Sequence, residues 1–410
     1  MALAAAAVLW LVCAALLWRT EVPADLRLPD VAARGEFSSD ELERTAAYAR
    51  VPRALWVGST LAQLVLLAML ARRARPLASA LPGGAVARSV ALLLVALLGI
   101  WLVRLPFAAA GHWWRRRHGL SRQGYLDWLT APGLEHAAMV LVACVALLLA
   151  IVLARRLGGR WWFAGGPLLA ALGAGVVLLQ PLVLAPRLEP LADPVLTAEI
   201  RALADRVGVD AIAVEVKDAS ERTTTANAEI AGIGPTRRIV LWDTLLDGRF
   251  TRGEVRAVAA HELAHVGRSH LWKGLAWFAL LALPCVYVVA AVTRLRGGLG
   301  EPPAVPLAVL AVVALQLALL PFSNAVSRRY EAEADWLALE ATGDAAAARR
   351  LLHRFSETSL AQPDPPAWSY VLRSTHPSLL ERIALSRAWE ARREAGREAG
   401  RPPAASPGGS

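Results

Sequence analysis

The chain has 410 residues, of which 56% are hydrophobic and only 19% are charged. A soluble globular protein carries about 25% charged residues and a smaller apolar share, so most of this chain must face lipid or a dry core. The net charge of +10 does not indicate nucleic-acid binding, because no basic stripe is interleaved with stacking aromatic residues. Composition therefore predicts an integral membrane protein with a lipid bilayer, and no nucleic acid, as its partner.

Seven apolar segments approach the length of about 20 residues that a helix needs to cross a bilayer. They cover residues 2–18, 54–71, 86–110, 136–154, 161–186, 274–293 and 304–326. The first segment could be a signal peptide, but it lacks a positive region before the apolar run and a small-residue cleavage site. We therefore expect a retained helix and a mainly α, polytopic membrane fold with about seven transmembrane helices.

Two polar regions interrupt this pattern, at about 187–270 and from 327 to about 396. The first predicts an amphipathic helix over 193–207, short strands over 212–216, 227–233 and 238–242, and a helix through the 260s. Thr251 and Glu254 have the spacing of a capping box that starts this last helix. The second region opens with a predicted helix over 328–340, and the Gly-, Pro-, Ala- and Ser-rich tail 397–410 is expected to be disordered.

The sharpest motif is His261-Glu262-Leu263-Ala264-His265. Two histidines four residues apart on a helix lie on one face, so both rings can reach one zinc ion, while Glu262 can take a proton from a water on the metal. The three cysteines lie inside apolar runs without paired spacing, which argues against a cysteine-ligated metal. The motif predicts a site for one Zn²⁺ per chain.

A third protein ligand is needed for such a site, and the acidic helix 328–340 offers one. Glu331 and Asp335 are again four residues apart, so Glu331 could ligate zinc while Asp335 accepts the ring N–H of a ligand histidine. A solvated helix face is the alternative interpretation of this acidic cluster. We expect Glu333 and Glu340 to belong to such a solvated face.

Six segments in order resemble the CAAX prenyl protease type I family of membrane zinc endopeptidases. They are Gly119–Gln123, Asn227–Ala228, Arg237–Leu246, His261–His265, Ser327–Asp335 and Thr375–Arg382. The resemblance covers most of the chain, including the two apolar segments that follow the metal helix. It implies a small α+β zincin-like metalloprotease domain split between 187–270 and 327–396, with five spans in 1–186 and two in 271–326.

The resemblance also implies roles for individual residues. His261, His265 and Glu331 would bind zinc, Glu262 would be the general base, and His376 would stabilise the oxyanion. Asn227 would help hold the substrate backbone, and Arg382 would lie near the active site. From the residues alone, His376-Pro377 indicates only that a helix starts there. The remaining histidines match no motif and are expected to be interface or surface residues: His112, His118, His136, His270 and His353.

The implied activity is hydrolysis of peptide bonds in lipidated, CAAX-type or other membrane-associated proteins. If the source is bacterial, the protein would lie in the inner membrane, and the resemblance places the metal site on the cytoplasmic side. The arrangement of arginines around the spans does not determine the orientation. An HtpX-like quality-control or regulatory protease is the nearer alternative, and a non-enzymatic seven-span receptor or transporter is the remote one. Natural substrate, cleavage specificity and oligomeric state stay open.

Overall fold

The computed structural model describes residues 2–183, 188–210, 212–232 and 234–399. Within these residues, six helices are long and apolar enough to cross a membrane. They are α3 (Ser39–Arg72), α5 (Ala85–Arg117), α7 (Gly133–Leu157), α8 (Trp162–Val183), α11 (His270–Thr293) and α12 (Val305–Thr342). The predicted mainly α, polytopic membrane fold is confirmed.

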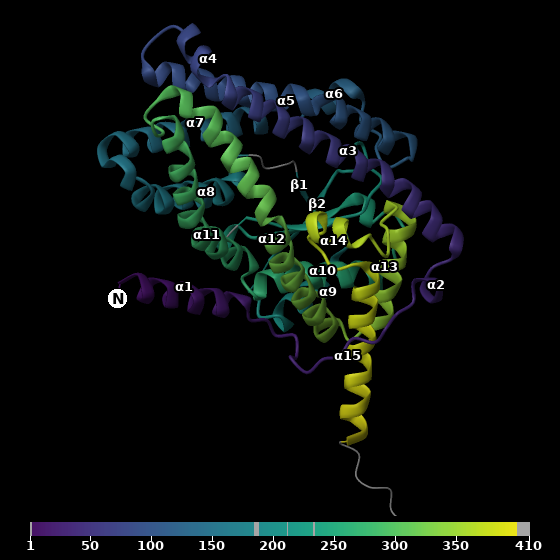
Figure 1. Cartoon of the computed structure of the whole chain (residues 1–410). Coiled ribbons are helices and arrows are strands. Elements are labelled where there is room, and N and C mark those ends of the chain that lie inside the picture. Colours follow the sequence, from purple (N-terminus) through teal and green to yellow (C-terminus); the bar gives the residue numbers. More distant parts are fainter. Residues whose placement is uncertain (1, 184–187, 211, 233, 400–410) are drawn as a thin grey trace, which may run out of the picture.

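The first predicted span forms helix α1 (Ala2–Trp18), which is shorter than the other six apolar helices. It extends from the body of the molecule (Figure 1) and reaches α11 through Trp10, whose indole Nε1 donates to the Leu280 carbonyl at 3.1 Å. That carbonyl lacks its usual helical partner, because Pro284 has no N–H to donate. The count of seven spans stays a prediction.

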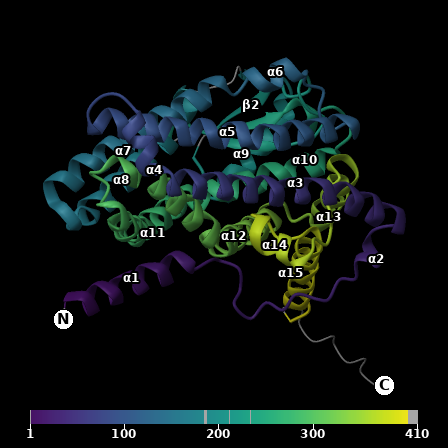
Figure 2. The same cartoon turned by 45° about the horizontal axis from the view of Figure 1, so that its top comes forward.

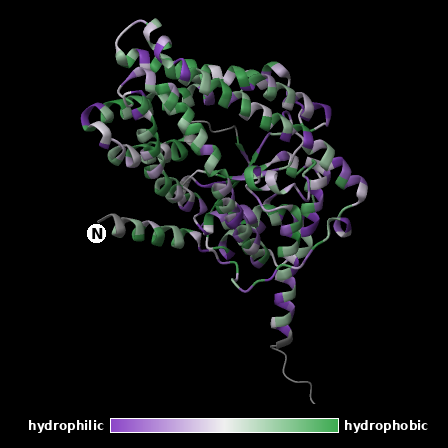
Figure 3. Ribbon diagram, viewed as in Figure 1, coloured by the Kyte–Doolittle hydropathy of each residue, from purple (hydrophilic) through white to green (hydrophobic). Residues whose placement is uncertain are grey.

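The apolar helices form one half of the molecule. Helices α3 and α5 pack along each other, and α8 packs on α11 (Figures 1 and 2). The buried side chains of this half make a core that includes Leu92, Ile151 and Trp161. Hydrophobic residues dominate this half, and hydrophilic residues gather in the other half (Figure 3). Three short helices join the long ones: α2 (Ala33–Glu36), α4 (Ala74–Ala80) and α6 (Tyr125–Thr130).

Helix α12 connects the two halves, because its 38 residues run without interruption from an apolar stretch into the acidic segment. The helix predicted over 328–340 is therefore the continuation of the last span. Its acidic residues are held on a long helix that is anchored at its other end among the apolar helices, and this makes their position rigid.

The first polar region folds into a four-stranded sheet backed by helices. The strands are β1 (Leu188–Pro190), β2 (Ala213–Lys217), β3 (Ala228–Ala231) and β4 (Arg238–Trp242), in the order β1-β2-β4-β3. Strands β2 and β4 are parallel, and the other pairs are antiparallel. Three strands match the predicted segments, whereas β1 was missed because three residues that end in proline carry no period-2 pattern. Strand β3 lies at the edge.

Two helices pack against this sheet, α9 (Pro194–Arg206) and α10 (Arg252–Gly267). Asp193 caps α9 by accepting from the Leu196 N–H, and α10 begins at the predicted capping box that Thr251 and Glu254 form. Buried residues from α9, α10 and the strands form one core, with Ile200, Ile239 and Leu263 fully enclosed. Packing against α9 and the sheet thereby fixes α10, the helix that carries the metal motif.

The second polar region adds α13 (Ala345–Ser359), α14 (Ala367–Arg373) and α15 (Leu379–Ala399). Helix α15 extends beyond the body of the molecule (Figure 1). The predicted disordered tail began at 397, but residues 397–399 belong to α15. Residues 400–410 lie outside the described residues. The division of the chain into membrane and metalloprotease segments stays a prediction.

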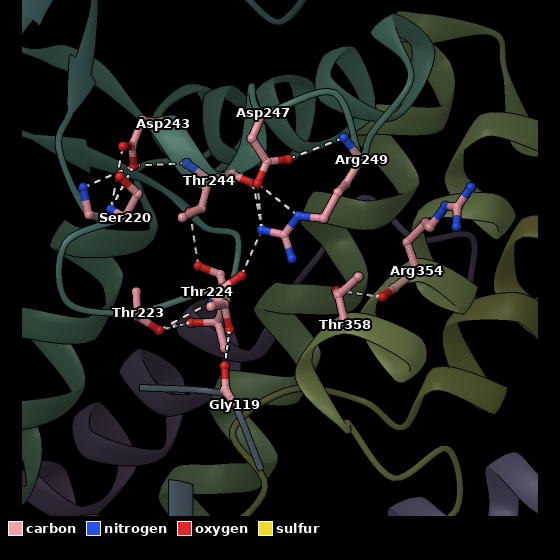
Figure 4. A network of polar contacts seen from close by, with 12 residues as sticks. Gly119, Ser220, Thr223, Thr224, Asp243, Thr244, Asp247, Arg249, Arg354 and Thr358 are labelled. Atoms are coloured by element: carbon pink, nitrogen blue, oxygen red, sulfur yellow. Dashed lines mark hydrogen bonds and ion pairs between the residues drawn. The ribbon is translucent and has the colours of Figure 1, made fainter. Parts of the chain in front are cut away.

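The connection between α5 and α6 is hydrogen-bonded to the loop that precedes β3. Thr224 donates to the Gly119 carbonyl at 2.8 Å and Thr223 donates to the Leu120 carbonyl at 3.0 Å. Asp243 accepts the backbone N–H groups of Ala219 and Ser220 at 2.9 and 3.0 Å and fixes the start of the same loop (Figure 4). The connection between α5 and α6 thus fixes, through these hydrogen bonds, the loop that leads into the edge strand β3.

Candidate metal centre

Helix α10 presents the two motif histidines on one face. His261 Nε2 and His265 Nε2 lie 3.2 Å apart, as expected for residues one helical turn from each other. His261 is buried, and His265 is half-buried. The opposite side of α10 is enclosed in the apolar core, so both rings are directed toward α12.

Glu331 on α12 meets both rings. Its Oε2 lies 3.1 Å from His261 Nε2, and its Oε1 lies 3.6 Å from His265 Nε2. Among the described residues, these three side chains form a group whose ligand atoms all lie within 4.8 Å of one another and could hold a metal ion. The spacing of residues 261, 265 and 331 in the sequence and in space is thus compatible with one metal site.

The second ring nitrogen of His261 is held by Asp335. The distance from His261 Nδ1 to Asp335 Oδ1 is 2.8 Å, and the Arg382 guanidinium donates to both oxygens of Asp335 at 2.7 Å. Burial acts to lower the pKa of His261, but the contacts with Asp335 and Glu331 outweigh it and raise the pKa to about 10. Asp335 and Arg382, separated by 47 positions in the sequence, therefore support one ligand of the candidate site.

The second ring nitrogen of His265 is held by a residue that the sequence did not predict. His265 Nδ1 lies 2.7 Å from His270 Nδ1, and His270 Nε2 lies 2.9 Å from Glu333 Oε2. His270 is buried and Glu333 is fully enclosed, so the expectations of an interface or surface histidine and of a solvated Glu333 were wrong. Glu340, by contrast, is exposed, although its carboxylate accepts from Trp389 Nε1. The only feature of the sequence that pointed to a role for Glu333 was its position between Glu331 and Asp335, and this position alone could not predict that its side chain is buried.

A pocket opens beside the three ligand atoms. Its lining includes Glu262, Asn227 at the entrance to β3, His376 and Arg382. Burial raises the pKa of Glu262, which suits a group that must accept a proton near neutral pH. His376 Nε2 lies 3.1 Å from Glu331 Oε2. All residues expected near the active site therefore lie within or beside one pocket.

His376 does not begin a helix as the sequence alone indicated. Helix α15 begins at Leu379, after Ser378 and Glu381 exchange hydrogen bonds between side chain and backbone. His376 lies before this cap, with its Nδ1 3.0 Å from the hydroxyl of Thr375 and with 57% of its side chain exposed. The ring lines the pocket and contacts Glu331 through its Nε2.

Comparisons with known proteins agree with this geometry. The sequence profile of Peptidase family M48 matches residues 190–390. The metalloprotease YhfN of Bacillus subtilis, named as uncharacterized, is 31% identical over 295 residues, which are 69% of this chain and 69% of that protein. The chain belongs to Peptidase family M48. The pocket of this M48 peptidase is therefore the candidate active site of a metalloendopeptidase, and the receptor or transporter alternative is wrong.

Two further comparisons extend the likeness beyond the family profile. A rice protein named CAAX prenyl protease 1 homolog is 27% identical over 256 residues, and the alignment spans 56% of this chain and 58% of the rice protein. The crystal structure of S. mikatae Ste24p superposes with a TM-score of 0.75 and 20% identity, covering 92% of this chain and 96% of that one. The M48 peptidase therefore shares the fold of this solved protein over nearly its whole length.

Proposed function

We propose that the protein is a zinc endopeptidase whose metal is held by His261, His265 and Glu331. The observation that carries the proposal is the spacing of the ligand atoms, which are 3.1, 3.2 and 3.6 Å apart. Tetrahedral zinc binds imidazole nitrogen and carboxylate oxygen at about 2.0–2.2 Å, so neighbouring ligand atoms are expected about 3.3–3.5 Å apart. The two imidazole nitrogens and the Glu331 carboxylate, whose Oε2 is the oxygen nearer His261 and whose Oε1 is the one nearer His265, fit one zinc ion with a fourth position left for water.

The chemistry of the nitrogens supports the same conclusion. Asp335 is an ion-paired carboxylate that can only accept, so His261 Nδ1 carries a hydrogen, and Nε2 directs a lone pair toward the site once it has lost its own proton. If His265 is oriented the same way, two lone pairs face each other at 3.2 Å. This arrangement is repulsive unless a cation lies between them, and in the metal-free protein a proton held by His261, whose pKa is raised to about 10, has this role. A zinc ion would supply that charge.

When bound, zinc would supply Lewis-acid chemistry, lowering the pKa of water and polarising the scissile carbonyl. Glu262, which lines the pocket, would take the proton of that water and deliver it to the leaving amine. His376 faces the same pocket and could donate to the developing oxyanion, a contribution of a few kcal/mol in comparable sites. Asn227 lies where β3 begins, at the sheet edge along which an extended peptide backbone could pair.

We propose lipidated, CAAX-type or other membrane-associated proteins as substrates. The pocket lies where the apolar helix α12 enters the polar half of the molecule, so a peptide tethered to the bilayer would reach it. Relatives named as CAAX prenyl proteases occur in rice and in Arabidopsis thaliana. Their names describe those proteins, and for this chain the substrate class is a hypothesis.

The experiment compares wild type and Glu262→Gln on a prenylated CAAX peptide and on the same peptide without the lipid. We expect cleavage of the prenylated peptide by wild type and at least about 1,000-fold less by the variant, with equal zinc content, because the amide keeps the size but cannot accept a proton from water. Turnover by the variant within about tenfold of wild type would refute the mechanism. Equal cleavage of both peptides would refute the lipid requirement and favour an HtpX-like role.

The orientation of the site is also a proposal. Helix α11 begins at His270 beside the metal site, and its 24 residues span about 36 Å, so the loop after Arg296 lies at the opposite membrane face. We propose that the metal site faces the cytoplasm. A cysteine placed at Gly298 in a variant with Cys13, Cys144 and Cys285 replaced should react with an impermeant reagent added outside intact cells. Reaction only after lysis would reverse the orientation.

A further inference from the structure

We infer that His270 and Glu333 form a relay that fixes the ring orientation and the tautomer of His265, and so act as positioning residues for the metal. The inference rests on the proposed ligand role of His265. It assigns a function to two buried polar residues outside the motif, and it follows from the direction of each hydrogen bond between Glu333 and His265.

The relay begins at Glu333, whose side chain is completely buried. Its Oε1 accepts from the Glu21 backbone N–H at 2.8 Å and from Arg268 Nε at 3.0 Å. Its Oε2 lies 2.9 Å from His270 Nε2 and 3.4 Å from Lys273 Nζ. A buried carboxylate next to two cations is ionised and only accepts hydrogen bonds. His270 Nε2 therefore carries a hydrogen and donates it.

The next step follows from the tautomer of His270. A neutral imidazole with hydrogen on Nε2 has a lone pair on Nδ1, and this Nδ1 lies 2.7 Å from His265 Nδ1. His265 must therefore donate from Nδ1, which leaves its Nε2 as the lone-pair nitrogen that faces His261 and Glu331. Metal binding requires this tautomer. The relay holds His265 ready for the metal without placing a carboxylate on it.

The backbone explains how His270 reaches His265. On one continuous helix, a residue five positions ahead would point about 140° away. Here α10 ends at Gly267, and Ser269 takes a left-handed conformation with φ 55° and ψ 38° before α11 begins. A non-glycine residue rarely adopts this conformation. The break turns His270 back toward His265, and the Tyr330 ring stacks on it with centroids 4.8 Å apart.

The relay also extends to the segment that follows α1. Glu21 contributes its backbone N–H to Glu333 and its carboxylate to Arg268, which lies 2.7 Å away. Arg268 thereby bridges Glu21 and Glu333. Four groups from three parts of the chain immobilise the Glu333 carboxylate, so the far end of the relay cannot reorient without breaking several contacts at once.

The test measures zinc affinity of the purified full-length protein by competition with a chelator, together with the visible absorption spectrum after cobalt substitution. His270→Phe keeps an aromatic ring on Tyr330 but removes both nitrogens. We expect it to bind zinc about 10–100-fold more weakly and to change the cobalt spectrum. His270→Gln, whose amide can both accept and donate, should recover part of the affinity. The matched control Tyr330→Phe keeps the stacked ring and should bind zinc within about twofold of wild type.

Zinc affinity and a cobalt spectrum equal to wild type in folded His270→Phe would overturn the relay. If that variant does not fold, Glu333→Leu, which leaves no acceptor for His270 Nε2, decides by the same measurements, with weaker binding supporting the relay and unchanged binding overturning it. Wild type that binds no zinc would instead refute the proposed function. The two failures are therefore distinguishable without any turnover measurement.

Discussion

The two motif histidines lie one turn apart on α10, yet the structure holds them by different means. His261 contacts the carboxylate of Asp335 directly, with Arg382 behind it. His265 contacts the neutral ring of His270, and the carboxylate of Glu333 lies one ring farther away. Both arrangements fix the tautomer, but only the first brings a negative charge against the ligand. The first therefore raises the pKa of its histidine as well as orienting the ring, and the second orients the ring through a neutral partner.

The residue shared by both histidines should give the largest effect. Glu331→Ala removes one of three proposed protein ligands, so zinc affinity should fall by more than the roughly 10–100-fold that loss of an outer partner causes. Zinc content after mild chelation measures this. Full retention of zinc would move the ligand role elsewhere, but Glu333 could not take it over, because its oxygens are already committed to Glu21, Arg268, His270 and Lys273.

His376 provides a contrast with both ligand histidines, because its Nδ1 contacts only the hydroxyl of its exposed neighbour Thr375. Without a buried carboxylate behind it, we expect it to act in the transition state. His376→Ala should lower kcat roughly 100-fold with zinc content, KM and melting temperature little changed. Loss of zinc would make it a ligand, and a lower melting temperature with kcat preserved would make it a structural residue.

Asp335→Ala tests the charged arrangement around His261. Zinc affinity should fall about 10–100-fold, as for His270→Phe, but stability should also fall, by roughly 3–5 kcal/mol, because the largely buried Arg382 loses its partner. Chelator competition and thermal melting separate the two effects. The double variant with Arg382→Ala should regain part of the melting temperature but not the zinc affinity. If the single variant melts like His270→Phe, the proposed difference between the two arrangements is wrong.

The smallest expected effect is a dependence of zinc binding on pH. In metal-free protein the pKa of His261 is raised to about 10, so zinc must displace a proton, and its apparent affinity should rise about tenfold per unit from about pH 7 to about pH 8.5. The same proton stabilises the metal-free fold below the unfolded pKa of about 6.5, and this contribution is lost as the pH rises toward 10. Titration and scanning calorimetry at several pH values would measure the rise of zinc affinity and the loss of stability of the metal-free protein with increasing pH. A zinc affinity that does not depend on pH would contradict the raised pKa of His261 and its role as a zinc ligand.

Much of the site could be predicted because its spacing is local. His261 and His265, and likewise Glu331 and Asp335, are separated by one helical turn, and helix geometry alone places each pair on one face. The strands β2, β3 and β4 were predicted for a similar reason, since alternation and turn residues mark them. Strand β1 and the unbroken length of α12 were not, because a three-residue strand has no period and a polar segment can continue an apolar helix without any signal at the junction.

The sequence by itself determined the membrane class, the metal motif and the candidate ligands, because composition and a fixed helical period act within a few residues. The tertiary structure alone decided which groups stand behind those ligands. His270 is five residues from His265, a spacing that points away on a straight helix, and it returns only because the chain breaks at Ser269. Glu333 is enclosed only because Glu21, Arg268 and Lys273 converge on it from other parts of the chain. Such convergence depends on long-range packing, which no local pattern records.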